Sequence, residues 1–533
     1  MNEKISAWSP LRQPLFRALW IASVASNIGT WMQSVGAAWL MTTLEPSPIM
    51  VALVQTASSL PFFLLALPAG ALADIVDRRR LLLLTQAWML AVAALLGVLT
   101  ILGVTTPWVL LVFTFLLALG TAMNAPAWEA INPELVPRSD IKAAVALSGI
   151  GTNVGRAVGP ALGGFLVAFA GPGYVFLLNA ASFVGVLVVL YRWNRPRHES
   201  VLPAERIMGA MRAGIRYTRH APALQTVLIR IGIFILCSSA LWALLPLLAR
   251  QEIGLDSFGY GMLLGFFGLG AVLTASILPK MRQSISSDFM VACATILFAA
   301  FIITLAYIRD FGLVSAAMVA GGAAWIALMS SFNAAAQTAI PSWVRARGLA
   351  LYLLVFQGGM ATGTLLWGAL AEYIGIPAAL KLAALGLVIG LMIFARYRLK
   401  AGEELDLTPW VHWPEPLVAG EPHMEHGPVL VMLEYNIDGE HSREFTKAMH
   451  ALRSVRLRDG AIRWELFHDA ANPCHFIEAF IVESWVEHLR QHERITAADR
   501  VVEEHARAFH SGSTPPKVSH FNYAYDMEDK EKS

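Results

Sequence analysis

Long apolar stretches separated by short polar connections dominate the first 400 residues of the chain. A helix needs about 20 apolar residues to cross the hydrocarbon core of a bilayer, and stretches of that length recur about twelve times. We place them near residues 15–42, 49–72, 81–103, 107–127, 143–170, 173–193, 222–249, 258–279, 288–308, 312–335, 347–374 and 376–397. The pattern predicts an all-α membrane protein that crosses the bilayer many times.

Basic residues fall on alternate connections between these stretches. Arg78, Arg79 and Arg80 follow the second stretch, and basic residues follow the fourth, sixth, eighth, tenth and twelfth, whereas the opposite connections carry few. Because basic connections stay on the cytoplasmic side, we expect both termini to be cytoplasmic. An even number of spans agrees with this orientation.

The two halves of this apolar region resemble each other. NAPAWEAINPELV at 124–136 is similar to NAAAQTAIPSWV at 333–344, with one residue gained or lost. The same offset matches Gly155 with Gly363. Parallel repeats are typical of transporters whose halves rock about a central site. We therefore expect two pseudo-repeated six-helix bundles.

A basic segment joins the two halves at 201–221. Ile207, Met211, Ile215 and Thr218 lie on one side of a helix, with arginines elsewhere. This pattern fits an amphipathic helix on the inner leaflet. A plain basic linker explains it equally well.

After Lys400 the pattern becomes polar. Residues 401–427 are rich in Pro, Trp and Glu and predict a linker. Over 428–524, short alternating stretches and helical stretches follow one another as βαββαβ, with the second helix broken near Thr496. That order predicts a small cytoplasmic α+β domain of ferredoxin-like topology. Residues 525–533 are expected to be a disordered tail.

Composition agrees with a membrane protein. The 533 residues are 56% hydrophobic and only 15% charged, which is too apolar for a soluble protein of this size. The net charge of +2 gives no bulk attraction to nucleic acid, so no nucleic-acid partner is expected. The three cysteines, Cys237, Cys293 and Cys474, suggest no disulfide framework.

Glycines repeat every four residues in the fifth stretch, which reads SGIGTNVGRAVGPALGG at 148–164. On a helix they form one bare stripe, and small residues let helices in lipid approach closely. Pro160 bends this helix, and Arg156 places a costly charge at membrane depth. Taken alone, the stripe fits an ordinary tight helix pair. The stripe comprises Gly151, Gly155, Gly159 and Gly163.

The segment GRAVGPALGG resembles the GxxxGPxxGG signature in the fifth helix of major facilitator superfamily exporters. The matching residues are Gly155, Arg156, Gly159, Pro160, Gly163 and Gly164, with Gly151 before them. Residues 10–400 as a whole resemble the enterobactin-exporter-like branch, the transmembrane secretion effectors. The resemblance implies a secondary transporter of the bacterial inner membrane that exports small molecules, such as a siderophore or drug. It also implies alternating access, with a proton as the counter-ion.

The loop after the second stretch resembles another signature of this superfamily, GxLaDrxGrRx. Gly70, Asp74, Arg78 and Arg79 match it, whereas Ile75 and Asp77 replace the usual basic residue and glycine. In the family this loop latches the two halves, and its aspartate caps a helix start across the interface, which is favourable for a carboxylate. We expect Asp74 and Arg78 to have this role, whereas Arg80 fits a topology anchor. The fourth-helix arginine of drug–proton antiporters is replaced here by Leu116.

A few polar side chains fall inside the predicted spans. Asn27, Thr30 and Gln33 make a polar face in the first span and are candidates to line a substrate cavity, together with Arg230. Arg156 and Arg230 suit either an anionic substrate or a structural ion pair. Four tryptophans either stack on an aromatic substrate or anchor spans at the interface, and these are Trp31, Trp39, Trp242 and Trp367.

The polar domain resembles dimeric α/β-barrel domains of the antibiotic-biosynthesis monooxygenase type, which implies dimerisation through this domain. His488 and His492 lie at i,i+4, a spacing that can hold a metal on a helix face. Without a nearby set of cysteines or carboxylates we expect solvated histidines, and no metal or other cofactor.

These observations favour an exporter of small molecules over two alternatives. An importer on the same fold is disfavoured by the glycine–proline signature. A bifunctional protein whose polar domain is an oxygenase or a ligand sensor remains a second alternative. No phosphate-binding loop of the Walker type occurs, so an ATP-driven pump is not expected. The resemblance implies a membrane transporter and not an enzyme, and it leaves the activity of the polar domain open. The expected domains are 1–200, 201–221, 222–400, 401–427, 428–524 and 525–533.

Overall fold

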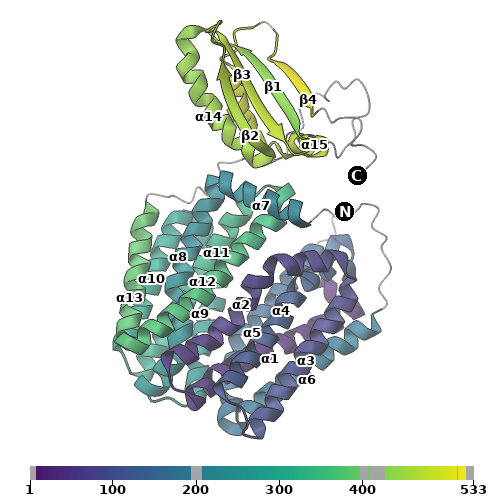
Figure 1. Cartoon of the computed structure of the whole chain (residues 1–533). Coiled ribbons are helices and arrows are strands. Elements are labelled where there is room, and N and C mark those ends of the chain that lie inside the picture. The colour runs from purple at the N-terminus through teal and green to yellow at the C-terminus, as the bar shows by residue number, and fades with distance from the viewer. Residues whose placement is uncertain are drawn as a thin grey trace. The chain divides into compact units, whose positions relative to one another are not determined.

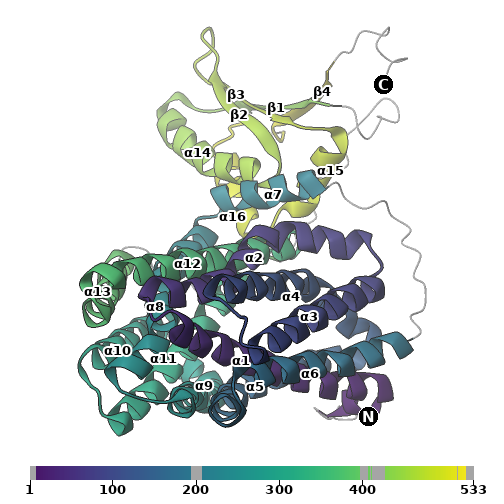
Figure 2. The same ribbon diagram turned by 60° about the horizontal axis from the view of Figure 1, so that its bottom comes forward.

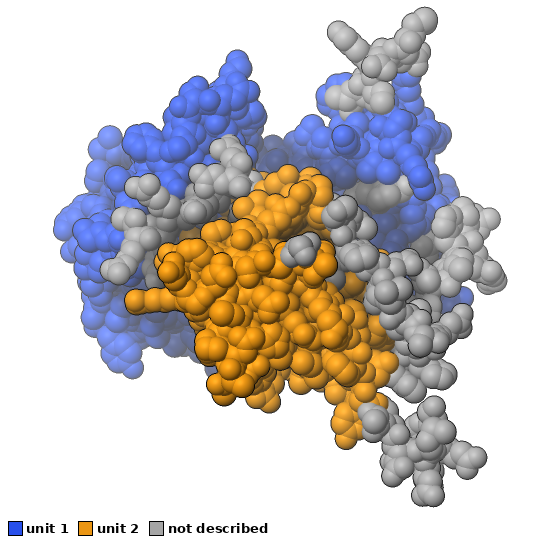
Figure 3. Space-filling model, turned by 90° about the horizontal axis from the view of Figure 1, so that it is seen from above, with its two compact units in different colours: residues 1–204, 228–333, 352–398 blue, residues 205–227, 334–351, 399–533 orange. Residues whose placement is uncertain are grey.

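The computed structural model describes residues 8–193, 207–395, 406–408, 410, 427–512 and 514–523. Most of the predicted linker and the predicted disordered tail, 525–533, lie outside these residues. The chain divides into two compact units, coloured separately in Figure 3. One comprises residues 1–204, 228–333 and 352–398, and the other comprises 205–227, 334–351 and 399–533.

Twelve long helices, in two sets of six, make up the apolar region (Figure 1). The first set is α1 (Pro14–Leu44), α2 (Pro48–Ile75), α3 (Arg78–Ile101), α4 (Pro107–Leu135), α5 (Ile141–Ala170) and α6 (Pro172–Arg192). The second set is α8 (Pro222–Leu247), α9 (Ser257–Ser284), α10 (Ser287–Tyr307), α11 (Phe311–Thr338), α12 (Arg345–Ile374) and α13 (Ile376–Ala395). Proline opens several of these helices, where its missing N–H costs nothing.

Eleven of the described helices are long and apolar enough to cross a membrane, and α1 is not among them. Its 31 residues are sufficient in length, but serine, asparagine, threonine and glutamine side chains make it more polar than the others. It packs along α5 and α6 and so completes the first set of six. The expected twelve-helix architecture is confirmed, with its first span the most polar.

The helix pairings repeat between the two sets. α3 packs on α6 in the first set, as α10 packs on α13 in the second. α4 and α5 are joined through a short 3-10 turn at Arg138–Asp140, and α11 and α12 through one at Ser342–Val344. These turns follow the two similar sequence segments, so the predicted duplication is confirmed.

The C-terminal domain contains a four-stranded antiparallel sheet in the order β2-β3-β1-β4. The strands are β1 (Val429–Asn436), β2 (Ala461–His468), β3 (His475–Val482) and β4 (Lys517–Asn522). With α14 (Ser442–Asp459), α15 (Trp485–Arg494) and α16 (Ala497–Arg507) between them, the chain order is βαββαβ. The ferredoxin-like prediction is therefore confirmed.

Alternation along the central strands divides the sheet into two faces. Val431 and Leu433 of β1 and Phe480 of β3 point to the core under the helices, which cover one face (Figure 2). The break between α15 and α16 occurs at Thr496, as predicted, because Thr496 and Asp499 form a capping box that starts α16.

The segment that joins the two halves contains a helix, α7 (Ile207–His220), which belongs to the same compact unit as the C-terminal domain. Glu487 of α15 pairs with Arg216 of α7 at 2.8 Å and with Arg494 at 2.6 Å. Arg494 in turn lies over the ring of Trp343, 4.6 Å from its centroid. Burial opposes ionisation of Glu487, but hydrogen bonds and charges from Arg494 and Arg216 hold its pKa below the usual value. The helix is confirmed, and its place on a membrane surface stays a prediction.

Candidate functional site

The glycine stripe of α5 lies directly against α1. Its members Gly151, Gly155, Gly159 and Gly163 face Val24, Asn27, Trp31 and Met32 in turn. A Cβ built at Gly159 would lie 2.5 Å from the Cβ of Trp31, so no larger residue fits without moving a helix. Close approach of this kind is how helices gain packing energy in lipid.

A second face of α5 packs against α9 of the other set. The contacting pairs are Ala157 with Gly268, Ala161 with Gly265, and Gly164 with Gly261. A Cβ at Gly164 would lie 2.8 Å from the Cα of Gly261, so these two backbones almost touch. α5 therefore bridges the two halves, with one small-residue face on each side.

α12 has the equivalent position in the second half. A Cβ at Gly363 would lie 2.7 Å from the carbonyl oxygen of Leu236 in α8, as the α5 glycines lie on α1. Its other face meets α2, where the hydroxyls of Thr364 and Thr56 are hydrogen-bonded at 2.9 Å. Gly368 lies against the first turns of α2. The two halves thus meet through two crossings, α5 on α9 and α12 on α2.

The halves are also joined at the end where α1 meets α2. Arg250, in a π-helical turn after α8, donates to the hydroxyl of Thr42 at 3.2 Å and lies over the ring of Trp39. Tyr260 of α9 stacks on the same Trp39, with ring centroids 5.7 Å apart. This end of the molecule is closed by polar and aromatic contacts between the halves.

At the other end, α5 and α9 separate. The face of α9 that contacts α5 at Gly261, Gly265 and Gly268 continues to Val272, which is 44% exposed. On α5 the contacting face continues from Ala157 to Asn153 and Ile150, which are also exposed. Residues in register with a packed stripe become exposed only where the two helices diverge. α5 and α9 therefore diverge toward the end that carries the α2–α3 connection.

Arg156 projects from α5 between its two packed faces. At 100° per residue it lies roughly opposite the outward, exposed Val158 and Leu162, so it points inward and not toward lipid. Its guanidinium lies over the ring of Trp31, 5.5 Å from the centroid. Its Nε is buried and has no hydrogen-bond partner.

Comparison with known proteins agrees with this architecture. Residues 5–526 match the family model described as transmembrane secretion effector. The chain belongs to this family of major facilitator transporters.

Named relatives of this transporter carry siderophores. It is 27% identical over 277 residues to the staphyloferrin A transporter of Staphylococcus aureus, covering 51% of this chain and 68% of that protein. It is 24% identical over 396 residues to the enterobactin exporter EntS of Salmonella typhi, covering 71% and 91%. A solved bacterial homolog of the human lysosomal transporter Spinster, in an inward-facing conformation, shares the fold with a TM-score of 0.59 and 15% identity, covering 74% of this chain and 98% of that one.

The three residues predicted to form one polar face on α1 point to different surroundings in the structure. Asn27 is half-buried and faces Gly155 of α5, and the half-buried Thr30 donates to the carbonyl of Ser26 on its own helix. Gln33 instead points to α6, where it is 4% exposed and accepts a hydrogen bond from Asn179 at 2.5 Å. Of the three, Asn27 is the one that contacts α5 directly before Arg156.

Arg230, the other predicted cavity arginine, forms an ion pair within the second half. Its guanidinium lies 2.7 Å from the carboxylate of Asp288 in the first turn of α10. Arg230 as a whole is only 4% exposed. The tryptophans also have protein partners: Trp242 packs on Trp325 and Phe267, and the indole N–H of Trp367 donates to a backbone carbonyl.

The loop after α2 holds the first half together. Arg78 pairs with Glu134 of α4 at 2.9 Å, and Arg79 donates to two carbonyls at the end of α6. Asp77 caps α3 by accepting from the backbone of Arg80. The surroundings of Gly70 and the side chain of Asp74 lie outside the described part of the structure, so the latch stays a prediction.

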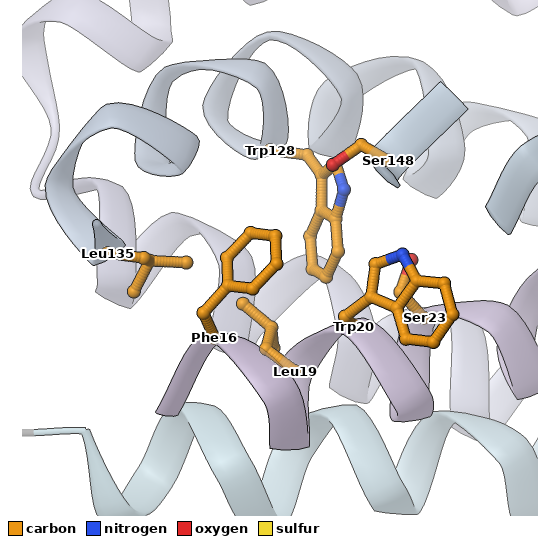
Figure 4. Close-up of a pocket in the computed structure, with 7 residues that line it drawn as sticks. All are labelled: Phe16, Leu19, Trp20, Ser23, Trp128, Leu135 and Ser148. Atoms are coloured by element: carbon orange, nitrogen blue, oxygen red, sulfur yellow. The ribbon is translucent and has the colours of Figure 1, made fainter. Parts of the chain in front are cut away.

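A hollow lies between α1, α4 and α5 (Figure 4). Its lining consists of Phe16, Leu19, Trp20, Ser23, Trp128, Leu135 and Ser148. It encloses ≈ 240 Å³, including open space, which is below the roughly 300–1,000 Å³ of typical ligand pockets. It is a groove in the first half and too small to hold a drug-sized substrate.

The expectation of solvated histidines on α15 is wrong for His488. This side chain is fully buried, between Trp485, His492 and His520. Burial and the neighbouring His492 lower its pKa to about 3, and burial lowers that of His492 to about 4. Within the described residues no group of three histidine, cysteine or acidic side chains is arranged to hold a metal.

The predicted site omits the glycines of α9, although their spacing is visible in the sequence. Gly261, Gly265 and Gly268 recur at i, i+4 and i+7, which is one face of a helix. Recognising that stripe as the partner of the small-residue face of α5 requires knowing which helices are neighbours.

Proposed function

We propose that this transporter exports small molecules from the cytoplasm across the bacterial inner membrane by alternating access. The named relatives include a siderophore exporter and a siderophore transporter. The basic residues of the α2–α3 connection and of the alternate connections after it support a cytoplasmic location for these connections and for both termini. The small-molecule substrate then enters from the cytoplasmic side.

The observation that carries this proposal is the pair of crossings between the halves. α5–α9 and α12–α2 are packed at the α1–α2 end and, for α5 and α9, separated at the other. Small residues at both crossings let the helices separate and close again without moving large side chains. Related repeats about a central site are the architecture that alternating access uses.

A proton gradient is the proposed energy source. Secondary transporters of this fold lack a nucleotide site, and this sequence contains no phosphate-binding loop. Leu116 stands where drug–proton antiporters have an arginine, so the coupling residue differs from theirs. Gly120 on the same helix packs against Trp88 and Met89, which gives it a structural role.

The C-terminal domain is proposed to dimerise through the uncovered face of its sheet. Leu430, Met432 and Ile481 form apolar rows on that face, and exposed Phe467 and Phe521 extend them. Charges of both signs border the rows, namely Arg463, Glu465, Glu434 and Lys517. A face of this kind is self-complementary in a two-fold dimer. Size-exclusion chromatography of Leu430→Asp tests it, since a monomer is expected only for the variant.

Transport in everted membrane vesicles tests the main proposal. Siderophores and drugs are offered one at a time under an imposed gradient with an acidic lumen, with Gly159→Leu as the inactive control. Accumulation in the lumen that nigericin abolishes supports proton-coupled export. Accumulation only in right-side-out vesicles supports the importer alternative. No accumulation of any compound in either preparation contradicts transport of these substrate classes.

A further inference from the structure

Arg156 is a charged side chain near the middle of a 30-residue apolar helix. A guanidinium at this depth is costly unless a counter-charge or water stabilises it. In the described residues no carboxylate pairs with Arg156 and no acceptor takes a hydrogen bond from it. Its one specific contact is with the face of Trp31. Among the residues that the structure describes, Arg156 is therefore a half-buried charge without a counter-charge.

The second intramembrane arginine shows what compensation looks like in the same fold. Arg230 is more deeply buried and lies 2.7 Å from Asp288. Arginines inside membrane proteins usually have a partner of this kind. Arg156 lacks a described counter-ion, so a structural ion pair does not explain it.

The position of Arg156 points to a ligand from the space between the halves. It lies opposite the exposed Val158 and Leu162, so it points away from the outer face of α5. The exposed Thr152 and Asn153 precede it by one turn, on the stretch of α5 that has separated from α9. Arg156 therefore lies next to the stretch where the two halves diverge.

From this geometry we infer that Arg156 is the anion-binding residue of the substrate site and that the substrate carries a carboxylate. A guanidinium presents its N–H donors in a rigid fork that matches a carboxylate with two parallel hydrogen bonds. Trp31 holds the guanidinium by a cation–π contact, 5.5 Å from Cζ to the ring centroid, which uses none of its N–H donors. Asn27, a half-buried polar residue of α1, contacts the neighbouring Gly155. The inference rests on the proposed transport function and names its substrate class.

Thermal melting of the full-length transporter in nanodiscs tests this inference without knowing the natural substrate. The probes are salicylate and citrate, with salicylamide as the neutral counterpart of salicylate, all at one ionic strength. We expect the carboxylates to raise the melting temperature of the wild type. They should raise that of Arg156→Lys by a smaller amount. The carboxylates should not change the melting temperature of Arg156→Gln. Salicylamide should not change the melting temperature of the wild type or of either variant.

The melting temperature without ligand separates binding from structure. Because Arg156 is uncompensated, Arg156→Gln is expected to melt no lower than the wild type, whereas Arg230→Gln should melt lower because it breaks the pair with Asp288. A lower melting temperature for Arg156→Gln, or equal stabilisation of that variant by the carboxylates, overturns the inference. So does the absence of any carboxylate effect on the wild type.

Uptake of radiolabelled salicylate and salicylamide into everted vesicles distinguishes the two proposals. Equal export of both compounds by wild type and Arg156→Gln leaves export standing and overturns the anion site. Arg156-dependent stabilisation by carboxylates without vesicle uptake leaves the anion site standing and contradicts export of these probes.

Discussion

Replacing Gly159 by alanine adds one methyl group at the tightest contact between α1 and α5. The new Cβ would lie 2.5 Å from the Cβ of Trp31 and 3.0 Å from the carbonyl oxygen of Ile28. Ordinary contacts begin at 3.4 Å, so the two helices must move apart by about 1 Å there. The positions of these atoms are fixed by the backbone of α1, so rotation of a side chain cannot relieve the clash.

Overpacking of this kind costs about 1–3 kcal/mol. The separation also displaces Trp31, on whose ring the guanidinium of Arg156 lies. We therefore expect Gly159→Ala to lower the melting temperature by several degrees and to reduce transport more than it reduces membrane insertion. Gly159→Leu, which is larger, should abolish transport while still inserting.

Gly149→Ala is the matched control, because Gly149 lies on the same helix and a Cβ there meets nothing within 4 Å. Both substitutions gain the same helix propensity, about 0.5–1 kcal/mol. The assay compares melting in nanodiscs and vesicle transport for the two variants at equal expression. Equal melting temperatures and equal transport for Gly159→Ala and Gly149→Ala would refute the packing of α5 on α1.

Three further predictions follow from the described contacts. Below pH 6.5 His488 and His492 become protonated in the unfolded chain but stay neutral in the folded domain, so the free energy of unfolding decreases as the pH is lowered. Asp459 has the opposite effect, because burial raises its pKa to about 6 in the folded domain. At pH 5 we expect a net decrease in the free energy of unfolding of about 2–3 kcal/mol relative to pH 7. Hydrogen exchange of β3 measures this loss, and the double variant with glutamine at both histidines should remove most of it. Gln33→Leu should cost about 1–3 kcal/mol by leaving the buried amide of Asn179 without its acceptor, and leucine at both positions should restore much of the melting temperature. Glu487→Gln should raise exchange in α7, whereas Glu465→Gln, in an exposed pair on the same domain, should not.

Hydropathy and spacing predict most of the fold. Length and apolarity locate every long helix, since bilayer thickness sets both quantities. The similar segments at 124–136 and 333–344 predict the duplication. The helix break near Thr496 is also predicted, and the structure shows that Thr496 and Asp499 start a new helix there through a capping box. The glycine stripe predicts that α5 has a close neighbour, which the structure identifies as α1.

Other features depend on which helices are neighbours, and one sequence carries little information on that. Gln33 and Asn27 both look like cavity residues, but only contact with α6 shows that Gln33 is paired. Arg230 and Arg156 are equivalent as intramembrane charges until Asp288 is seen beside one of them. His488 looks solvated because its neighbours on α15 are polar, whereas β4 supplies His520 to bury it.

A reversible disulfide across the α5–α9 crossing tests the central claim most directly. A Cβ at Gly265 would lie 3.4 Å from that of Ala161, close to the mean of about 3.8 Å in disulfides. Cysteines are placed at both positions, and the exposed Cys293 and Cys474 are replaced by serine while buried Cys237 is kept. If the halves must separate here for each transport cycle, oxidation should stop vesicle transport in proportion to the cross-linked fraction, and reduction should restore it. Fully cross-linked protein that transports at the unmodified rate would contradict alternating access through this crossing.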